Sequence, residues 1–210
     1  MGNRFAEIAF TPAVQAQQVA YGSRDSYRRF SGGEPSNDRL GPKEIEFIEA
    51  RDGFYLASVG ETGWPYVQFR GGAPGFLRVL DEQTLAWADF RGNRQYVSVG
   101  NLGGSDRVSI FLMDYANRRR LKIFGHAEIR ALGADDGLAA RLEMPGYKAV
   151  VERAVLVQIA GFDWNCPQHI TPRFTLAEIE RATRPLRDRV AELEAKLVSC
   201  ERGNGNVASG

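Results

Sequence analysis

The sequence contains few of the cysteine and histidine residues that disulfides and metal sites require. Among 210 residues there are two cysteines, Cys166 and Cys200, and two histidines, His126 and His169. Structural zinc normally needs four clustered ligands, and only Cys166 and His169 lie close together in the sequence. Cys200 stands beside a tail rich in Gly, Asn and Ser, which disfavours a structural disulfide. We therefore expect neither a structural metal site nor a disulfide framework.

An excess of charge of one sign and long apolar runs are also missing. The chain carries 27 basic and 26 acidic side chains, for a net charge of +1, whereas nucleic-acid binders have a clear basic excess. No apolar run has the length needed to cross a bilayer. Arg4 and Glu7 interrupt the N-terminal segment, unlike the apolar core of a signal peptide. We expect a cytoplasmic protein with neither a nucleic-acid nor a membrane partner.

Common nucleotide and hydrolase motifs are absent as well. The sequence contains no Gly-x-Gly-x-x-Gly after a strand, no Walker loop, no Gly-x-Ser-x-Gly and no His-Glu-x-x-His. These absences disfavour Rossmann, P-loop, serine hydrolase and zinc protease sites. Carboxylates are frequent, but no pair of them stands out as an acid–base couple.

What the chain does contain is a series of short β-prone segments. Two of them, 54–59 and 64–69, flank a Gly-containing turn at 60–63 and predict a hairpin. Further strands are expected at 76–80, 84–88, 108–113, 121–129 and 154–159. Short strands with hairpin-length turns indicate an antiparallel barrel or sandwich, so the predicted fold class is mainly β with flanking helices, α+β.

Helix signals lie mainly outside the β-prone region. Thr11 before Pro12 predicts a capped helix as far as Val19. A second helix is expected to begin at Gly41-Pro42 and to end at Gly53. Brief helices are expected at 95–102 and 134–143.

The C-terminal segment predicts a longer helix. Thr175 and Glu178 fit a capping box, and Pro185 should kink or restart the helix beyond it. A single apolar seam follows, formed by Leu186, Val190, Leu193 and Leu197. Packing of this seam on the barrel and pairing across a dimer both remain open. Residues after Glu201 are expected to be disordered.

These patterns divide the chain into four regions. Residues 1–41 form an arm, because 31–38 is rich in turn formers and poor in core formers. The barrel takes up 42–172. A C-terminal helical extension covers 173–201, and a tail covers 202–210.

Arginine, glycine and amide side chains cluster at two predicted strand ends, 68–72 (QFRGG) and 88–95 (ADFRGNRQ). Arginine holds a phosphate monoester through two parallel hydrogen bonds. Arg94 comes at the start of an expected helix, whose N-terminus favours negative charge. The alternative is that Arg70, Arg91 and Arg94 are ordinary surface arginines at turns. Their clustering beside glycines favours a phosphate site with a flat ring system next to it.

Several motifs then follow one another in a specific order. They are 63–72 (GWPYVQFRGG), 75–81 (GFLRVLD), 90–94 (FRGNR), 119–125 (RRLKIFG) and 163–170 (DWNCPQHI). Over about residues 42–170 the chain resembles the pyridoxamine 5'-phosphate oxidase-like family of flavin-binding proteins. The resemblance implies an antiparallel split β-barrel of the FMN-binding type. It also implies a homodimer that holds two flavins at the subunit interface.

The resemblance further implies three groups of residues around the FMN. One group lines the ring and the ribityl chain, and a second holds the phosphate. The third completes the site in the dimer: Arg120 makes a polar flavin contact, and the other three residues lie over the ring from the partner subunit. In that order they are Val67, Gln68, Phe69, Arg70, Trp87 and Ala88; Asn93, Arg94 and Gln95; and Arg120, Trp164, Gln168 and His169.

Two departures from the oxidase itself bear on the substrate. Gln95 stands where the oxidase has a second phosphate-binding lysine. The oxidase's substrate-binding C-terminal ending is replaced by 164–170 and the helix. The resemblance therefore supports flavin binding far better than vitamin B6 oxidation or any other named substrate.

Three functions are compatible with this pattern. The first is an FMN-dependent oxidoreductase with a small-molecule substrate, in which flavin N5 carries the chemistry and no catalytic base is assigned. His169 is then either a proton donor or a hydrogen-bonded loop histidine, and Trp164 either stacks on the flavin or closes the barrel. The second is a non-catalytic flavin-binding or storage protein. The third is a haem-binding split barrel with His169 or His126 as the axial ligand.

Overall fold

The computed structural model describes residues 2–28, 30, 35–132, 137–164 and 166–205. The chain separates into two compact units, and each is described by itself. The first comprises Met1–Asp114 and Arg118–His169, and the second comprises Tyr115–Asn117 and Ile170–Gly210. Among the described helices, none has the length and apolar character required to traverse a bilayer.

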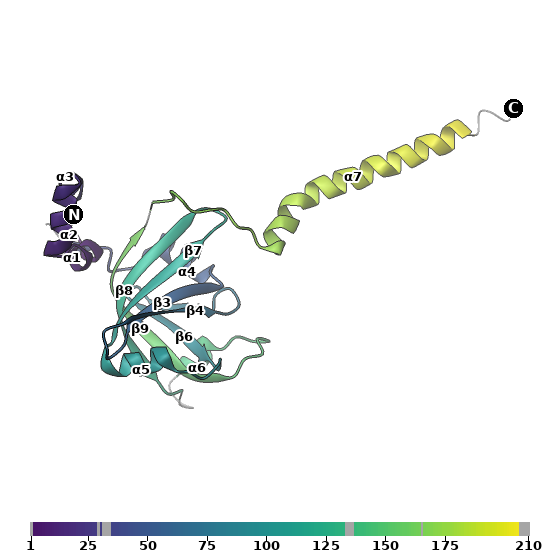
Figure 1. Cartoon of the computed structure of the whole chain (residues 1–210). Helices are drawn as coiled ribbons and strands as arrows, with labels where there is room; N and C mark the ends of the chain where they lie inside the picture. Colours follow the sequence, from purple (N-terminus) through teal and green to yellow (C-terminus); the bar gives the residue numbers. More distant parts are fainter. Residues whose placement is uncertain (1, 29, 31–34, 133–136, 165, 206–210) are drawn as a thin grey trace. The chain divides into compact units, whose positions relative to one another are not determined.

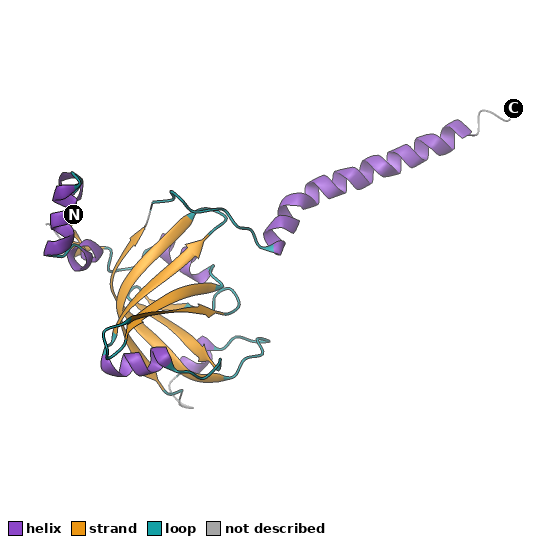
Figure 2. Ribbon diagram, in the orientation of Figure 1, coloured by secondary structure: helices purple, strands orange, loops and turns teal. Residues whose placement is uncertain are grey.

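The first unit is built on a seven-stranded antiparallel sheet in the order β4-β3-β7-β8-β9-β6-β5. The strands are β3 (Gly53–Val59), β4 (Pro65–Gly71), β5 (Arg78–Asp81), β6 (Thr84–Phe90), β7 (Arg107–Asp114), β8 (Arg119–Arg130) and β9 (Val151–Trp164). Figure 2 shows these strands (orange) curving around a shared interior. The strand order leaves β4 and β5 as the two separate edges of the sheet. The sheet is therefore an open, split barrel, and the predicted α+β fold class is confirmed.

Each predicted strand is present, and the β3–β4 hairpin has the predicted turn. The pairing runs from Gly53 opposite Gly71 to Val59 opposite Pro65. The largest difference concerns β9, which extends beyond both ends of the predicted strand 154–159. The additional residues at its start include Glu152 and Arg153.

Helices and two short strands lie outside the large sheet, and Figure 1 labels the helices. They are β1 (Gly2–Asn3), α1 (Arg4–Ala9), α2 (Pro12–Ala20), α3 (Arg24–Arg28), β2 (Pro35–Ser36), α4 (Pro42–Glu49), α5 (Val97–Gly104), α6 (Leu138–Leu142) and α7 (Leu176–Gly205). The predicted cap of α2 is confirmed, since the Thr11 hydroxyl accepts a hydrogen bond from the Val14 N–H at 3.4 Å. Helix α4 ends at Glu49 and not at the predicted Gly53, which instead begins β3. Part of the predicted helix 134–143 lies outside the described residues.

The N-terminal arm contains a helix that the sequence did not predict, and this helix packs on the barrel. Phe5 of α1 stacks on Phe124 of β8 with ring centroids 4.6 Å apart. A Cβ atom at Gly161 of β9 would lie 2.7 Å from the Phe5 backbone nitrogen. The absence of a side chain at Gly161 therefore allows α1 to approach the sheet this closely.

The second unit consists mainly of α7, and the predicted capping box at its start is confirmed. The Thr175 hydroxyl accepts the Glu178 N–H at 3.2 Å, and the Glu178 carboxylate accepts the Thr175 N–H at 2.7 Å. Pro185 lies inside α7, so no new helix begins there. The helix ends at Gly205, beyond the predicted end at Glu201.

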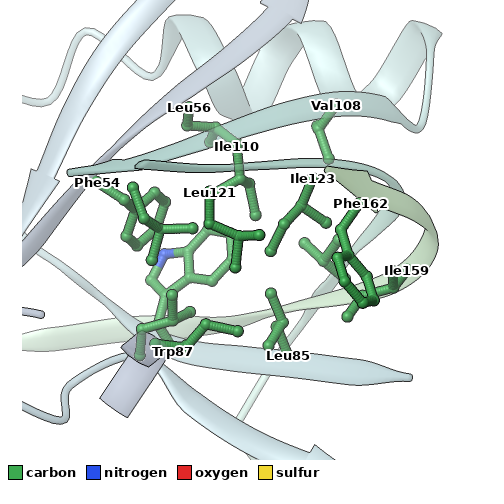
Figure 3. Close-up of a cluster of buried hydrophobic side chains, with 14 of the residues drawn as sticks. Phe54, Leu56, Leu85, Trp87, Val108, Ile110, Leu121, Ile123, Ile159 and Phe162 are labelled. Carbon is green, nitrogen blue, oxygen red and sulfur yellow. The ribbon is translucent and has the colours of Figure 1, made fainter. Parts of the chain in front are cut away.

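The interior of the barrel is filled by one large apolar cluster contributed by β3, β6, β7, β8 and β9. Figure 3 shows its central side chains pointing toward one another: Phe54, Leu56, Leu85, Trp87, Val108, Ile110, Leu121, Ile123, Ile159 and Phe162. A second cluster covers the other face of β6, where Ala86 and Ala88 meet Leu138 and Leu142 of α6. Strand β6 is therefore buried on both faces, and this positions the site at its end.

Candidate functional site

Two cavities share part of their lining at the ends of β4 and β6, next to the start of α5. We call the first, with a volume of about 30 Å³, the polar cleft, and the second, of about 300 Å³, the inner cavity. Both are lined by Gln68, Arg70, Asp89, Phe90 and Gly92. The polar cleft is also lined by Tyr66, Asn93, Arg94, Gln95, Tyr96, Val97, Val99 and Glu152. The inner cavity is also lined by Phe69, Gly71, Phe76, Trp87, Ala88, Arg91, Tyr147 and Ala149.

The register of the β3–β4 pair places polar side chains on the inward face of an edge strand. Arg70 lies opposite Phe54, and Gln68 lies opposite Leu56. Opposite residues in an antiparallel pair share one face of the sheet, and both β3 side chains are buried in the core. Arg70 and Gln68 therefore face the interior at the open edge of the barrel.

A buried ion-pair cluster joins β4, β6 and β9 at this edge. The Asp89 carboxylate lies 2.7 Å from Arg70 Nη1 and 3.7 Å from Arg153 Nε, and Asp89 is only 4% exposed. Burial raises the pKa of the Asp89 carboxyl group, and the two guanidinium groups oppose this shift only in part. Arg70 Nε is buried and has no hydrogen-bond partner among the described residues, so Arg70 retains an unused donor.

Glu152 of β9 ties the cluster to the loop that leads into α5. Its carboxylate accepts hydrogen bonds from Arg91 Nε at 3.0 Å and from the Tyr96 hydroxyl at 3.1 Å. The Arg91 hydrogen bond is the main reason why the pKa of Glu152 is lowered, with smaller contributions from Tyr96 and Arg153. The Arg153 guanidinium also lies 5.0 Å from the Tyr96 ring centroid.

The charged groups around the polar cleft do not balance. Arg70, Arg91, Arg94 and Arg153 supply four positive charges, whereas Asp89 and Glu152 supply two negative charges. The difference, four minus two, is a surplus of two positive charges. Such a surplus at the mouth of a cleft favours an anionic ligand.

The backbone of the loop at 92–96 adopts a costly conformation. Arg94 and Tyr96 both have positive φ, 63° and 54°, although neither is glycine. Residues with a side chain adopt this region at a cost of about 1–2 kcal/mol each. Between them, the Gln95 N–H donates to Asn93 Oδ1 at 3.2 Å. The loop is thus held in a defined shape with the Arg94 side chain exposed.

Gln68 is oriented by a residue of α5. The buried Ser98 hydroxyl donates to Gln68 Oε1 at 2.9 Å. With its carbonyl oxygen occupied, the Gln68 amide can offer its N–H groups to a ligand in the cavities.

The structure brings together most of the residues that were predicted to contact FMN from one subunit. Those that line the two cavities are Gln68, Phe69, Arg70, Trp87, Ala88, Asn93, Arg94 and Gln95. Trp87 is 1% exposed and contributes mainly to the core. Val67 lines neither cavity and is 59% exposed.

The residues that were predicted to act from a partner subunit line neither cavity in their own chain: Arg120, Trp164, Gln168 and His169. Trp164 instead donates its indole N–H to Glu44 Oε1 of α4 at 2.7 Å and packs edge-on against Phe47. His169 is exposed and has a positive φ of 61°. Their role toward a flavin stays a prediction.

Sequence reasoning missed the residues that orient the predicted ones. Asp89 was seen within a polar cluster but had no role, although it stands two residues after Trp87 on one strand and so shares its inward face. Glu152 and Arg153 lie before the predicted start of β9, outside every predicted strand. The role of Ser98 had no sequence signal, because it depends on how α5 docks.

A larger, mostly apolar hollow of about 550 Å³ lies on the outer face of the sheet. We call it the outer cavity, and its lining includes Ile8 of α1, Val59, Phe124 and His126. The His126 ring nitrogen Nδ1 lies 3.0 Å from Asp106 Oδ2. Across the described ranges, no group of three or more His, Cys, Asp or Glu side chains could hold a metal ion.

Comparison with known proteins identifies the family. The family model for pyridoxamine 5'-phosphate oxidase matches residues 40–159, whereas the sequence matches no curated protein. HupZ from Group A Streptococcus is 17% identical, with 64% of this chain and 100% of that chain covered and a TM-score of 0.45. A Clostridium acetobutylicum protein related to general stress protein 26 is 17% identical (65% and 94% covered, TM-score 0.43). The haem storage protein HutZ from Vibrio cholerae is also 17% identical (60% and 94% covered, TM-score 0.40).

The structural similarities are weak, whereas the family match covers more than half of the sequence. The matched residues include β3 to β8, α5 and the residues that line the polar cleft and the inner cavity. This chain belongs to the pyridoxamine 5'-phosphate oxidase family.

Proposed function

We propose that the chain binds FMN and acts as a flavin-dependent oxidoreductase on a small molecule. In this proposal the phosphate occupies the mouth of the polar cleft and the ring system lies against the inner cavity. The observation that carries the proposal is the surplus of two positive charges around the cleft. A phosphate monoester carries about −1.5 to −2 at neutral pH, so it matches this surplus.

The residues around the cleft also fit a phosphate in kind. Arg94 presents an exposed guanidinium on a loop of fixed shape, and Asn93 and Gln95 flank it. Guanidinium and phosphate form short, paired, charge-assisted hydrogen bonds. Arg70 adds positive charge from the wall of the cleft.

The inner cavity fits a flat ring system. Its lining includes Phe69, Phe76, Phe90 and Tyr147, with the Gln68 amide among them. Its volume of about 300 Å³ lies at the lower end of the range of small-molecule sites, which are mostly apolar with a few oriented polar groups.

Bound FMN would supply hydride or electron transfer at its N5 position. The chain's own residues would bind the phosphate, orient the ring and shield it from water. Asp89, the carboxylate in the wall of both cavities, is already engaged by Arg70 and Arg153. This arrangement agrees with a mechanism in which the protein provides no dedicated base.

We further propose that the working form is a homodimer. The outward face of the β3–β4 hairpin exposes Tyr55, Val59, Val67 and Phe69 by 37–59%. Contiguous exposed apolar surface of this kind commonly marks an interface. A second copy would cover it, and would also provide the route by which Arg120, Trp164, Gln168 and His169 reach the flavin.

The test compares FMN with riboflavin, which lacks the phosphate. We expect R94A to weaken FMN binding by about 10- to 100-fold, because charge-assisted hydrogen bonds contribute about 1.5–3 kcal/mol. Riboflavin affinity should be unchanged. R130A, which removes an arginine that is paired with Glu128 on β8, is the matched control. Equal losses for both ligands, or no loss for FMN, would contradict the placement of the phosphate.

Haem binding is the second candidate, and it has an observation of its own. His126 lies in the wall of the apolar outer cavity, and imidazole is a common axial ligand of haem iron. Titration with hemin separates the two candidates. A Soret band that H126A abolishes would favour haem, whereas a yellow protein with flavin absorption that does not change in H126A favours FMN.

A further inference from the structure

Helix α7 carries an apolar seam that none of the described residues of its own unit covers. Leu186, Val190, Leu193 and Leu197 recur at intervals of four, three and four residues, and they are 69%, 52%, 44% and 64% exposed. This spacing is the a/d pattern of a heptad, with Leu186 and Leu193 at d and Val190 and Leu197 at a.

The rest of this helix segment is polar, so the seam is narrow. Apart from Val198, the large side chains off the seam between 186 and 199 are charged. A helix that packs on a globular core has a broader apolar stripe, whereas a strict a/d stripe is typical of a coiled coil. The pattern therefore favours a second helix of the same kind as the occupant of the seam.

We propose that α7 pairs with α7 of a second copy of this chain as a parallel, two-stranded coiled coil. A β-branched residue at a with leucine at d favours parallel dimers. Val190 is a β-branched residue at an a position, and it lies between two leucines at d positions, Leu186 and Leu193. The flanking charges determine the direction of the pair.

In a parallel pair, each g residue faces the e residue five positions later on the other helix. Arg189 occupies g and Glu194 the matching e, so each Arg189 would face a Glu194 of the second helix. Lys196 and Glu201 repeat this combination in the sequence. Both flanks of a parallel pair therefore bring opposite charges together.

Within a single α7 these charged side chains form different ion pairs. Arg189 and Lys196 both bond to Glu192, at 2.6 Å and 2.5 Å, while Glu194 makes no ion pair within the described residues. Glu194 is therefore free to take Arg189 from another helix. An antiparallel pair with the same seam would place Arg187 near Glu194 on one flank but Arg189 near Lys196 on the other, where like charges repel.

The length of the seam sets a condition on this inference. Pro185 lacks a backbone N–H and disfavours close pairing upstream, which leaves about two heptads. A coil this short needs a tether that keeps the helices at an effective concentration in the millimolar range. The inference thus rests, for its stability, on the homodimer that forms part of the proposed function.

Disulfide trapping in the full chain tests the pairing. The native thiols are removed by C166S and C200S, and a single cysteine is introduced by L193C at a d position or, as the matched control, by A195C on the outer face. We expect L193C to crosslink under mild oxidation at least about tenfold faster than A195C, because tethering holds the d positions of two parallel helices together. The substitution R189E should slow L193C crosslinking, and the double substitution R189E/E194R should restore it.

The remaining outcomes overturn the proposal in distinguishable ways. Equal crosslinking at 193 and 195 shows that the seam is not the contact, for example because it packs on the barrel. Preferential crosslinking between V190C and L193C chains indicates an antiparallel pair. The molecular mass from sedimentation separates the two proposals. A dimer without 193-specific crosslinking contradicts the coiled coil but not the homodimer, whereas a monomer contradicts both. Crosslinking without flavin binding contradicts only the FMN proposal.

Discussion

The middle of the barrel and its open edge are built from the same strands, but the buried side chains are apolar in the middle and charged at the edge. Along β6, Leu85 and Trp87 are buried among apolar side chains, and two residues further on Asp89 is equally buried between two arginines. On β8, Leu121 and Ile123 are fully buried in the apolar cluster. The change occurs at the edge strand β4, where the described residues provide no further strand to cover the interior.

The difference indicates that the two regions serve different purposes. Buried ion pairs contribute little net stability, because desolvation offsets their attraction. The raised pKa of Asp89 shows that burial outweighs the help of Arg70 and Arg153. The apolar region should therefore determine how stable the fold is, and the charged edge should determine what the protein binds.

The largest effect is expected from the apolar region. We expect I123A to lower the free energy of unfolding by about 2–5 kcal/mol, because it leaves a cavity in a fully buried position. The FMN affinity of the protein that remains folded should not change. Urea unfolding measures the first quantity and flavin titration the second. V19A, at an exposed position of α2, should stay within about 0.5 kcal/mol. If I123A lowered the free energy of unfolding by less than V19A does, the apolar region would not determine the stability of the fold.

An intermediate effect, on binding, is expected from the charged edge. R70A should weaken FMN binding by about tenfold, or about 1.4 kcal/mol, because one of the four positive charges around the cleft is lost. Its effect on the free energy of unfolding should be smaller than that of I123A, because Arg153 still faces Asp89 and the Asp89 carboxyl group, whose pKa is raised, can take up a proton. Fluorescence titration with FMN and urea unfolding of the same preparation provide both numbers. A variant that binds FMN normally but unfolds more readily than I123A would reverse the comparison.

The smallest effect is a pH dependence. The folded-state pKa of Asp89 is raised, so its contribution to stability is full below the unfolded-state pKa of about 3.9 and declines as the pH rises through the folded-state value. The stability of the wild type relative to D89N should therefore fall as the pH rises above about 4, by about 1.4 kcal/mol for each unit of pKa elevation. Urea unfolding of both proteins at several pH values measures this difference. A difference that grows with pH would mean that the arginines outweigh burial.

Much of the local structure was predictable from neighbouring residues. The β3–β4 hairpin follows from two β-prone runs around glycines, and the capping box at Thr175 and Glu178 follows from their spacing alone. Helix α1 was missed because its stability comes from Phe5 stacking on Phe124, far away in the sequence. The start of β9 was missed because Glu152 is held by Arg91 and Tyr96, which lie far away in the sequence.

The sequence by itself determined the order of strands and turns, the heptad on α7 and the contiguous loop residues Asn93, Arg94 and Gln95. Each of these depends on residues a few positions apart. Only the tertiary structure decided that Asp89 and Arg153 would meet Arg70 at an open edge. That meeting depends on the pairing of β9 with β6 and on the open edge at β4, and pairings between distant strands are set by the packing of the whole barrel.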